Sequence, residues 1–205
     1  FIADGFSVNP HEPCLYVKWL DGVPILALTH VDDVTIVSRQ DHIDEMMARI
    51  EKVFSIKRLG ALGLNKDGTP SLLLGMEITR THDEFQIRQT RLIDILIEKA
   101  GTALDSIPHE KVPIRDLRLD TSSSPVTVAD KAKWKLRKYR SFLGIIGYLC
   151  LASRNECSYA FKELSRFNDC YGKEHWDALL RLIAYLKKHR DEMYFCISRH
   201  GGLSL

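Results

Sequence analysis

Apolar runs separated by turn signals predict an antiparallel sheet in the first part of the chain. The dipeptide Asp21-Gly22 between two β-type runs is a strong hairpin signal, and a third apolar run follows a short polar break. We therefore expect three antiparallel strands, at 14–19, 24–28 and 34–37. Apolar residues then recur at helical spacing from Asp41 to Phe54, which predicts one amphipathic helix packed on the sheet.

The next segments predict a second hairpin and a helix. Residues 72–78 and 85–88 are apolar runs around the polar turn 81–84, and Gly75 inside the first run indicates a bulge or the close approach of another backbone. A helical pattern from Arg91 ends at Gly101, which suits a helix stop.

A change of composition divides the chain. Residues 106–130 contain three of the seven prolines and the run Thr-Ser-Ser-Ser, which predicts a linker. Beyond it, helical spacing predicts helices at 131–151, 158–167 and 174–188, and a strand at 194–198 closes the pattern. The sequence thus predicts an α+β fold with a sheet domain at 1–105, the linker, and a helical region at 131–205.

The adjacent aspartates Asp32 and Asp33 are the first candidate for chemistry. They lie in the polar break 29–33, so we expect them at a hairpin tip. Successive side chains on a strand point to opposite faces, so neighbouring carboxylates can serve one site only where the backbone turns. Because like charges repel, a half-buried pair indicates a bound cation, and Mg²⁺ is the hard ion held by carboxylates and substrate phosphates. The alternative is a solvated turn, since Asp favours turns.

Charge is distributed unevenly. Residues 1–130 carry 14 Lys/Arg and 20 Asp/Glu, whereas residues 131–205 carry 15 and 7. The segment 131–140 interleaves six basic residues with two aromatics, a composition that suits a nucleic-acid backbone. An exposed helix face beside a core tryptophan, Trp134, would give the same pattern.

Other features of the sequence exclude several classes of protein and of active site. The five cysteines form no CxxC pair, and no run approaches the roughly 20 apolar residues of a membrane span, so we expect an intracellular protein of the cytoplasm or nucleus. Phosphate-loop, serine-hydrolase and zinc-protease motifs are absent from the sequence. His82-Asp83 matches the metal-binding dipeptide of HD-type phosphohydrolases, but that family places it on helices, and here we expect a solvated turn. Both ends of the chain fall in folded-type sequence, which suggests a piece of a longer polypeptide.

Together these motifs resemble the reverse transcriptase of copia-type LTR retrotransposons. His30-Val31-Asp32-Asp33 is similar to that family's Tyr-Val-Asp-Asp box, and Leu74-Gly75-Met76-Glu77-Ile78 is similar to its Leu-Gly-Ile-Glu-Ile strand. Further matches follow in the family's order and approximate spacing, at 5–6, 12–16, 57–60, 139–144, 147–149, 164–167, 175–176 and 185–187. The chain departs from the family at His30 and at 153–157, where the family has Thr-Arg-Pro-Asp-Ile.

The resemblance implies a palm-type antiparallel sheet followed by a thumb- or connection-like helical region. It implies RNA-directed DNA synthesis, with Asp32 and Asp33 holding two Mg²⁺ ions about 4 Å apart. Primer and template contacts are implied for Gly75, Met76, Glu77, Lys135, Lys138, Tyr139 and Arg140, and Lys57 is a candidate proton donor to pyrophosphate. The implied partners are an RNA or DNA template-primer, deoxynucleotides and the rest of a retroelement polyprotein.

By the same resemblance, a third catalytic aspartate would lie upstream of Phe1, so we expect the chain to be inactive alone. Two alternatives remain. The first is a catalytically dead retroelement remnant that only binds nucleic acid or folds. The second is a metal-dependent phosphohydrolase built on His82 and Asp83.

Overall fold

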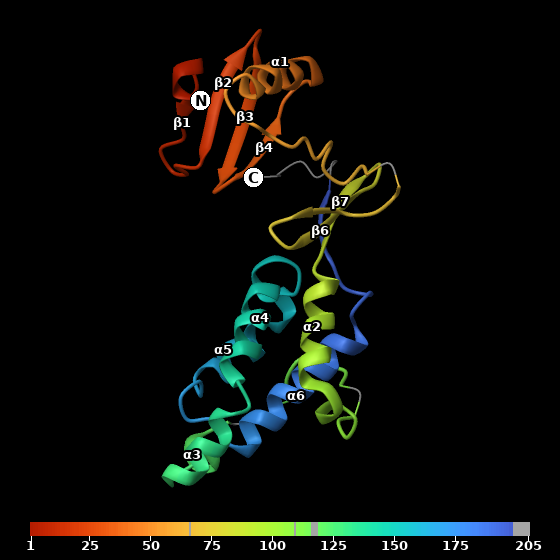
Figure 1. Ribbon diagram of the computed structural model, residues 1–205. Coiled ribbons are helices and arrows are strands. Elements are labelled where there is room, and N and C mark those ends of the chain that lie inside the picture. The colour runs from red at the N-terminus through yellow and green to blue at the C-terminus, as the bar shows by residue number, and fades with distance from the viewer. Residues whose placement is uncertain (66, 109, 116–118, 199–205) are drawn as a thin grey trace, which may run out of the picture. The chain divides into compact units, whose positions relative to one another are not determined.

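The computed structural model describes residues 1–65, 67–108, 110–115 and 119–198 (Figure 1). The chain forms two compact units, Phe1–Leu59 and Gly60–Leu205. Two antiparallel four-stranded sheets with packed helices confirm the α+β fold. Residues 109 and 116–118 of the predicted linker, and 199–205 of the predicted helical region, lie outside the described residues.

The first unit is a four-stranded antiparallel meander with one helix on it. Its strands are β1 (Ser7–Val8), β2 (Leu15–Leu20), β3 (Val23–His30) and β4 (Asp33–Val37), and they lie side by side in this order. The three predicted strands are confirmed. The helix α1 (Gln40–Glu51) begins one residue before the predicted start and ends three residues before Phe54.

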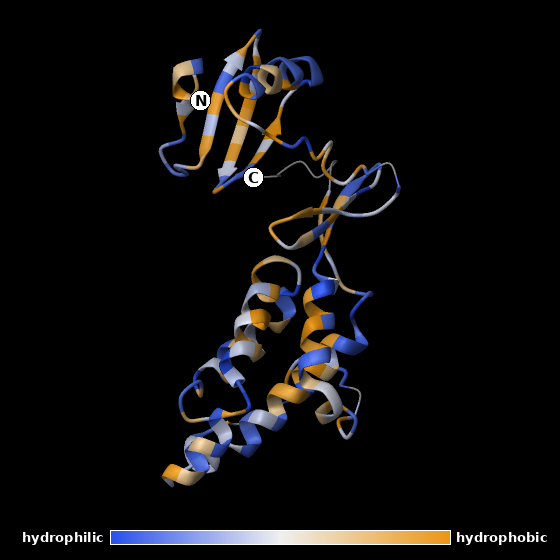
Figure 2. Ribbon diagram, viewed as in Figure 1, coloured by the Kyte–Doolittle hydropathy of each residue, from blue (hydrophilic) through white to orange (hydrophobic). Residues whose placement is uncertain are grey.

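Alternation along the strands explains why α1 covers one sheet face. Ile25 and Ala27 of β3 point to the same side and are fully buried with Met46 of α1 and Phe6. Figure 2 shows the matching alternation of apolar and polar residues along these strands. The Asp21-Gly22 turn has positive φ at both residues, 51° and 73°, as an Asp-Gly hairpin turn requires.

The second unit contains the other sheet. Its strands are β5 (Ser71–Leu73), β6 (Met76–Arg80), β7 (Glu84–Arg88) and β8 (Phe195–Ser198), in the order β5-β6-β7-β8. The bulge predicted at Gly75 is wrong: Leu73 pairs with Met76, and Leu74-Gly75 forms a two-residue turn with φ of 50° and 74°. Leucine gives no turn signal, which is why the run 72–78 resembled one continuous strand.

The helices of the second unit are α2 (Thr90–Ala100), α3 (Val128–Lys135), α4 (Tyr139–Ala152), α5 (Ser158–Ser165) and α6 (Lys173–Lys188). This unit also has short 3-10 helices at Gly101–Leu104, Thr121–Ser123 and Asn155–Cys157, and the first unit has one at Ile2–Asp4. The helices share one apolar core, in which Leu96, Ile146, Leu164 and Leu182 have no exposed surface. The predicted continuous helix 131–151 is wrong. It breaks at residues 136–138, where Lys138 has a positive φ of 53°.

A buried histidine attaches the described part of the 106–130 segment to α6. His175 Nδ1 accepts a hydrogen bond from Gly172 N at 3.0 Å, and His175 Nε2 donates to Asp120 O at 2.9 Å. A Cβ at position 172 would lie 1.7 Å from Ser123 O, so only glycine permits this approach. Burial lowers the pKa of His175, and the two hydrogen bonds require its neutral form.

A search of the described helices for a membrane span finds none with the necessary length and apolar character.

Candidate functional site

The predicted hairpin tip carrying the two aspartates is confirmed. His30 pairs with Asp33 across the end of β3 and β4, so Val31-Asp32 forms the two-residue loop. Asp32 and Asp33 are both exposed, where the sequence predicted half-buried side chains. Neither carboxylate makes a hydrogen bond or ion pair within the described residues. Their oxygens are therefore available to a ligand from outside the unit.

Val31 gives the tip an unusual backbone. Its φ is +53°, and its side chain is 90% exposed, so no packing contact favours valine there. A left-handed conformation costs an L-residue about 1–2 kcal/mol, and β-branched residues rarely adopt it. Strain of this kind concentrates at functional sites because it fixes a geometry that an unstrained turn would not give. Here it sets the direction in which the chain presents Asp32 and Asp33.

The tip offers two carboxylates, and no third candidate metal-binding side chain lies with them among the described residues. No group of three or more His, Cys, Asp or Glu side chains with metal-binding geometry occurs in the described part of the chain. Two carboxylates suit Mg²⁺, which is usually bound through one or two carboxylates together with water and substrate phosphates. By themselves they can hold such an ion only weakly.

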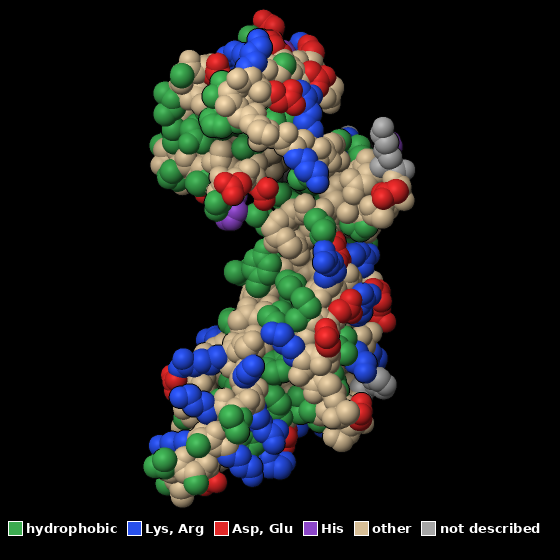
Figure 3. Space-filling view, viewed as in Figure 1, with side chains coloured by type: hydrophobic (Ala, Val, Ile, Leu, Met, Phe, Trp, Pro, Cys, Tyr) green, Lys and Arg blue, Asp and Glu red, His purple; other side chains and the backbone are tan. Residues whose placement is uncertain are grey.

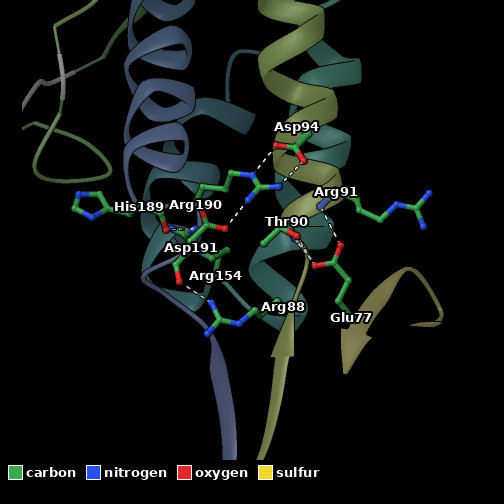
Figure 4. Close-up of polar contacts among 9 residues, drawn as sticks. All are labelled: Glu77, Arg88, Thr90, Arg91, Asp94, Arg154, His189, Arg190 and Asp191. Carbon is green, nitrogen blue, oxygen red and sulfur yellow. Dashed lines mark hydrogen bonds and ion pairs between the residues drawn. The ribbon is translucent and has the colours of Figure 1, made fainter. Parts of the chain in front are cut away.

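Glu77, a candidate primer contact, instead caps a helix. Its carboxylate accepts hydrogen bonds from Thr90 N at 3.1 Å and Arg91 N at 3.2 Å, and a short one from Thr90 Oγ1 (Figure 4). Only 8% of the residue is exposed. A carboxylate at a helix N-terminus satisfies free N–H groups and interacts favourably with the helix dipole. Glu77 therefore fixes β6 to α2 from inside the unit.

The charged groups around this cap are paired as well. Arg190 donates two hydrogen bonds to the Asp94 carboxylate, at 2.6 and 2.7 Å, which lower the pKa of Asp94 and raise that of Arg190 (Figure 4). Arg88 donates to Asp191 O at 2.6 Å. Buried Arg154 donates to Glu156 at 2.6 Å. The Arg190 and Arg88 contacts connect α2 and β7 to the end of α6, and Arg154 reaches the same end by donating to His189 O at 3.1 Å. Their role is structural.

The tip of the β5–β6 hairpin is attached to α4. Tyr148 Oη of α4 donates a short hydrogen bond to Leu74 O, and a Cβ at Gly75 would lie 3.8 Å from the Tyr148 ring. Leu74 and Gly75 remain exposed, and Met76 is half-buried. The tip is thus a fixed, exposed backbone edge beside α4. Tyr148 is the residue that sequence reasoning did not assign to the site, although it lies in the matched segment 147–149.

Of the predicted nucleic-acid contacts in and beside the basic segment 131–140, some side chains are exposed and one is buried in the core. Lys135, Lys138 and Arg140 are exposed at the junction of α3 and α4, and Figure 3 shows Lys and Arg side chains gathered over this end of the unit. Tyr139 has no exposed surface: its ring stacks on Tyr171 at 4.3 Å between centroids, and its hydroxyl donates to Leu164 O at 3.0 Å. Burial raises the pKa of Tyr139. Its side chain supports the junction and is not available to a ligand.

Two minor candidates have simple environments. Lys57 is exposed in the segment after α1. His82 and Asp83 lie in the turn between β6 and β7, as predicted, with His82 Nδ1 2.7 Å from Asp83 Oδ1. Since both are exposed on a turn, they lack the helical setting of an HD-type metal site.

Comparison with known proteins finds a similarity to a retrotransposon polyprotein, which supports an origin in a copia-type retroelement. The relative is the Retrovirus-related Pol polyprotein from transposon TNT 1-94 of Nicotiana tabacum, at 28% identity over 180 residues. The match covers 86% of this chain and 13% of that polyprotein. No protein-family model and no solved structure matches the chain.

Proposed function

We propose that the chain is the later palm and the thumb- or connection-like part of a copia-type reverse transcriptase, which adds deoxynucleotides to a primer 3′ end. The observation that carries this proposal is the exposed Asp32-Asp33 pair on a strained hairpin tip, in a chain similar to a retrotransposon Pol polyprotein. When bound, magnesium supplies Lewis-acid activation of the primer hydroxyl and neutralises charge on the leaving pyrophosphate. Asp32 and Asp33 would hold two such ions together with a carboxylate from outside this chain.

The second unit would hold the template-primer. Lys135, Lys138 and Arg140 offer exposed cations to backbone phosphates, and such contacts are independent of sequence. The Leu74-Gly75 tip offers an exposed backbone with which to position the primer. Glu77 and Tyr139 act indirectly, by fixing the hairpin and the α3–α4 junction. Lys57 remains the candidate proton donor to pyrophosphate.

The second candidate function is a remnant that binds nucleic acid without catalysis. It is favoured by His30, which stands where the family's box has tyrosine, and by the altered segment 153–157. Both candidates require a nucleic-acid surface, and only the first requires the aspartates.

Two measurements test the proposal. Fluorescence anisotropy with a labelled RNA–DNA hybrid should show weak binding whose affinity falls steeply with salt, because each phosphate contact releases counterions. Lys135→Ala/Lys138→Ala should reduce the slope of log K against log salt by about 2. Lys187→Ala/Lys188→Ala, which removes two exposed lysines at the end of α6, should not change it. An affinity that does not change with salt concentration would contradict the proposal.

Primer extension then separates the two candidates. The 205-residue chain with primer, template, deoxynucleotides and magnesium should give no product, since two carboxylates do not complete a two-metal site. Joined to the upstream polymerase segment, an active copy should extend the primer. If the joined protein binds the hybrid without extending it, the remnant is the better account. Extension by the 205-residue chain alone would overturn both.

A further inference from the structure

The tip of the β5–β6 hairpin, Leu74-Gly75, is held weakly by the hairpin itself. β5 has only three residues and pairs with β6 alone, so few ladder hydrogen bonds fix it. Leu74 has a φ of 50°, in the region where the Cβ of an L-residue crowds the next carbonyl oxygen. Exposed hairpin tips with few further contacts open easily. The position of this tip therefore depends on contacts from elsewhere in the unit.

Tyr148 of α4 makes such a contact with both residues of the tip. Its hydroxyl donates the short hydrogen bond to Leu74 O, and its ring would lie 3.8 Å from a Cβ at Gly75. Tyr148 is 37% exposed and Leu74 is 38% exposed, so the contact lies at the surface and outside the apolar core. Removal of the Tyr148 hydroxyl can thus release the tip and leave the fold of the unit intact.

The helix that carries Tyr148 is firmly packed. Ile146 and Leu149, on either side of Tyr148 in the sequence, have no exposed surface. At Gly147 a Cβ would lie 2.9 Å from Phe161 Cζ, so α4 and α5 are in close contact one residue before Tyr148. Close-packed interiors resist small displacements. The Tyr148 hydrogen bond therefore attaches the tip to the core of the unit.

A second path of contacts fixes the base of the same hairpin relative to α4. Glu77 of β6 accepts a hydrogen bond from Thr90 N at the start of α2, at 3.1 Å. Gln89, which directly precedes α2, accepts a 2.8 Å hydrogen bond from Ser153 Oγ, directly after α4. Gln89 and Ser153 are both buried. The hairpin is thus attached to α4 at two points, its base through α2 and its tip through Tyr148.

We propose that Tyr148 is a positioning residue for the primer 3′ end. Its hydroxyl fixes the Leu74-Gly75 backbone, and this exposed backbone sets where the primer lies. Tyr148 acts through the tip and makes no contact with the reacting atoms. The inference rests on the proposed function, to which it adds the residue that aligns the tip.

The test uses Tyr148→Phe, which removes the hydroxyl and keeps the ring. In the protein that joins the chain to the upstream polymerase segment, the single-turnover rate constant for adding one deoxynucleotide should fall about tenfold, because the reaction requires close alignment of the reacting atoms. The amplitude of that turnover, which counts the correctly folded enzyme, should change less than about twofold. A residue with only a structural role would lower the amplitude and leave the rate constant unchanged.

Affinity for the RNA–DNA hybrid provides an independent measurement. Lys135, Lys138 and Arg140 hold the phosphates in the proposed function, so the Kd of Tyr148→Phe for the hybrid should also change less than about twofold. Tyr159→Phe is the matched control. It removes an aromatic hydroxyl from the neighbouring helix α5, where Tyr159 is 64% exposed and its hydroxyl has no hydrogen-bond partner among the described residues. This control should match the unmodified protein in every measurement.

Hydrogen exchange in the 205-residue chain tests the contact without catalysis. The amides of residues 74–76 should exchange about fivefold faster in Tyr148→Phe, as expected for the loss of one hydrogen bond. The amides in the buried part of α4 should exchange as slowly as in the unmodified chain.

An unchanged rate constant for nucleotide addition overturns the inference, as does unchanged exchange at the tip. A Tyr148→Phe chain that does not fold, as judged by circular dichroism, would overturn it too, because the role of Tyr148 would then be structural. Loss of activity in Tyr148→Ala but not in Tyr148→Phe would assign the effect to the ring, which also contradicts it. If the unmodified joined protein extends no primer, the proposed function itself fails, whereas equal extension by the unmodified protein and Tyr148→Phe refutes the inference alone.

Discussion

The two predicted carboxylate positions, the Asp32-Asp33 tip and Glu77, have opposite environments. The aspartates are exposed on a strained turn and have no partner among the described residues. Glu77 is buried and accepts three hydrogen bonds at the start of α2. Each position lies in a motif that resembles the same family, yet only the first leaves its oxygens available to a metal ion. A motif match identifies a residue, whereas burial and hydrogen-bond partners decide whether its chemistry is available.

The largest expected effect tests the exposed member of this comparison. If the proposed polymerase is assembled by joining the chain to a segment that supplies the third carboxylate, Asp32→Asn or Asp33→Asn should reduce primer extension by at least about a thousandfold, because each removes a proposed metal ligand. Asp21→Asn is the matched control: it changes an aspartate at the other hairpin tip of the same sheet and should leave extension unchanged. Equal loss in all three variants would show that the meander, and not the metal ligands, had been disturbed.

Substitution of the buried carboxylate, Glu77, should change the stability of the second unit. Glu77→Ala should lower the free energy of unfolding by about 2 kcal/mol, since it leaves the first N–H groups of α2 without their carboxylate acceptor. Asp33→Ala should change it by less than about 0.5 kcal/mol, as expected for an exposed side chain. Urea denaturation followed by circular dichroism measures both. A small effect of Glu77→Ala would mean that water replaces the cap.

The stability of the second unit should depend on pH through the protonation of His175. Burial lowers its pKa in the folded chain below the unfolded value of about 6.5, although the Asp120 carbonyl and the charges of Glu174 and Asp120 act in the opposite direction. The unfolded chain therefore takes up the proton first, and stability should fall as the pH decreases below about 6.5. His175→Gln should flatten this part of the curve. The check is the difference between the two chains in urea midpoint at pH 7.5 and pH 5.5.

The smallest effect concerns the turn that presents the aspartates. Val31→Gly should raise the stability of the first unit by about 0.5–1 kcal/mol, because glycine adopts a positive φ without strain. The greater entropy of glycine in the unfolded chain offsets part of this gain. In the joined protein of the first prediction, the same change should lower primer extension, since a relaxed tip no longer fixes Asp32 and Asp33. Gly22→Val at the other tip should destabilise the unit without that specific loss of activity. Higher stability with unchanged extension would show that the strain at Val31 has no role in catalysis.

Local signals were sufficient for much of the fold. The Asp21-Gly22 signal and the apolar periods placed the β2–β4 meander, α1, α2 and α6 to within a few residues of their observed bounds. The tip position of Asp32 and Asp33 followed from the same pattern. Leu74 and Lys138 could not be predicted, because leucine and lysine rarely adopt positive φ and neither turn carries a Gly-Pro or Asn-Gly signal at that residue.

The rest of the site depends on contacts between distant residues. The acceptor role of Glu77 is set by Thr90, 13 positions later in the sequence. Tyr148 reaches a carbonyl 74 positions earlier. The burial of Tyr139 follows from its stacking on Tyr171. The composition of 131–140 therefore predicted correctly that its lysines and arginines are exposed, but it could not show that its tyrosine faces the core.

The pairing of β8 with β7 has a consequence for how the second unit is made. Phe195–Ser198 completes a sheet whose other strands lie more than 100 positions earlier. On the ribosome, the β7 edge stays bare while all the helices between β7 and β8 are synthesised, and long-range pairing of this kind forms slowly. A bare edge can pair with the same edge of another nascent chain. Polypeptides released before residue 195 should therefore aggregate, even with every helix of the unit already formed.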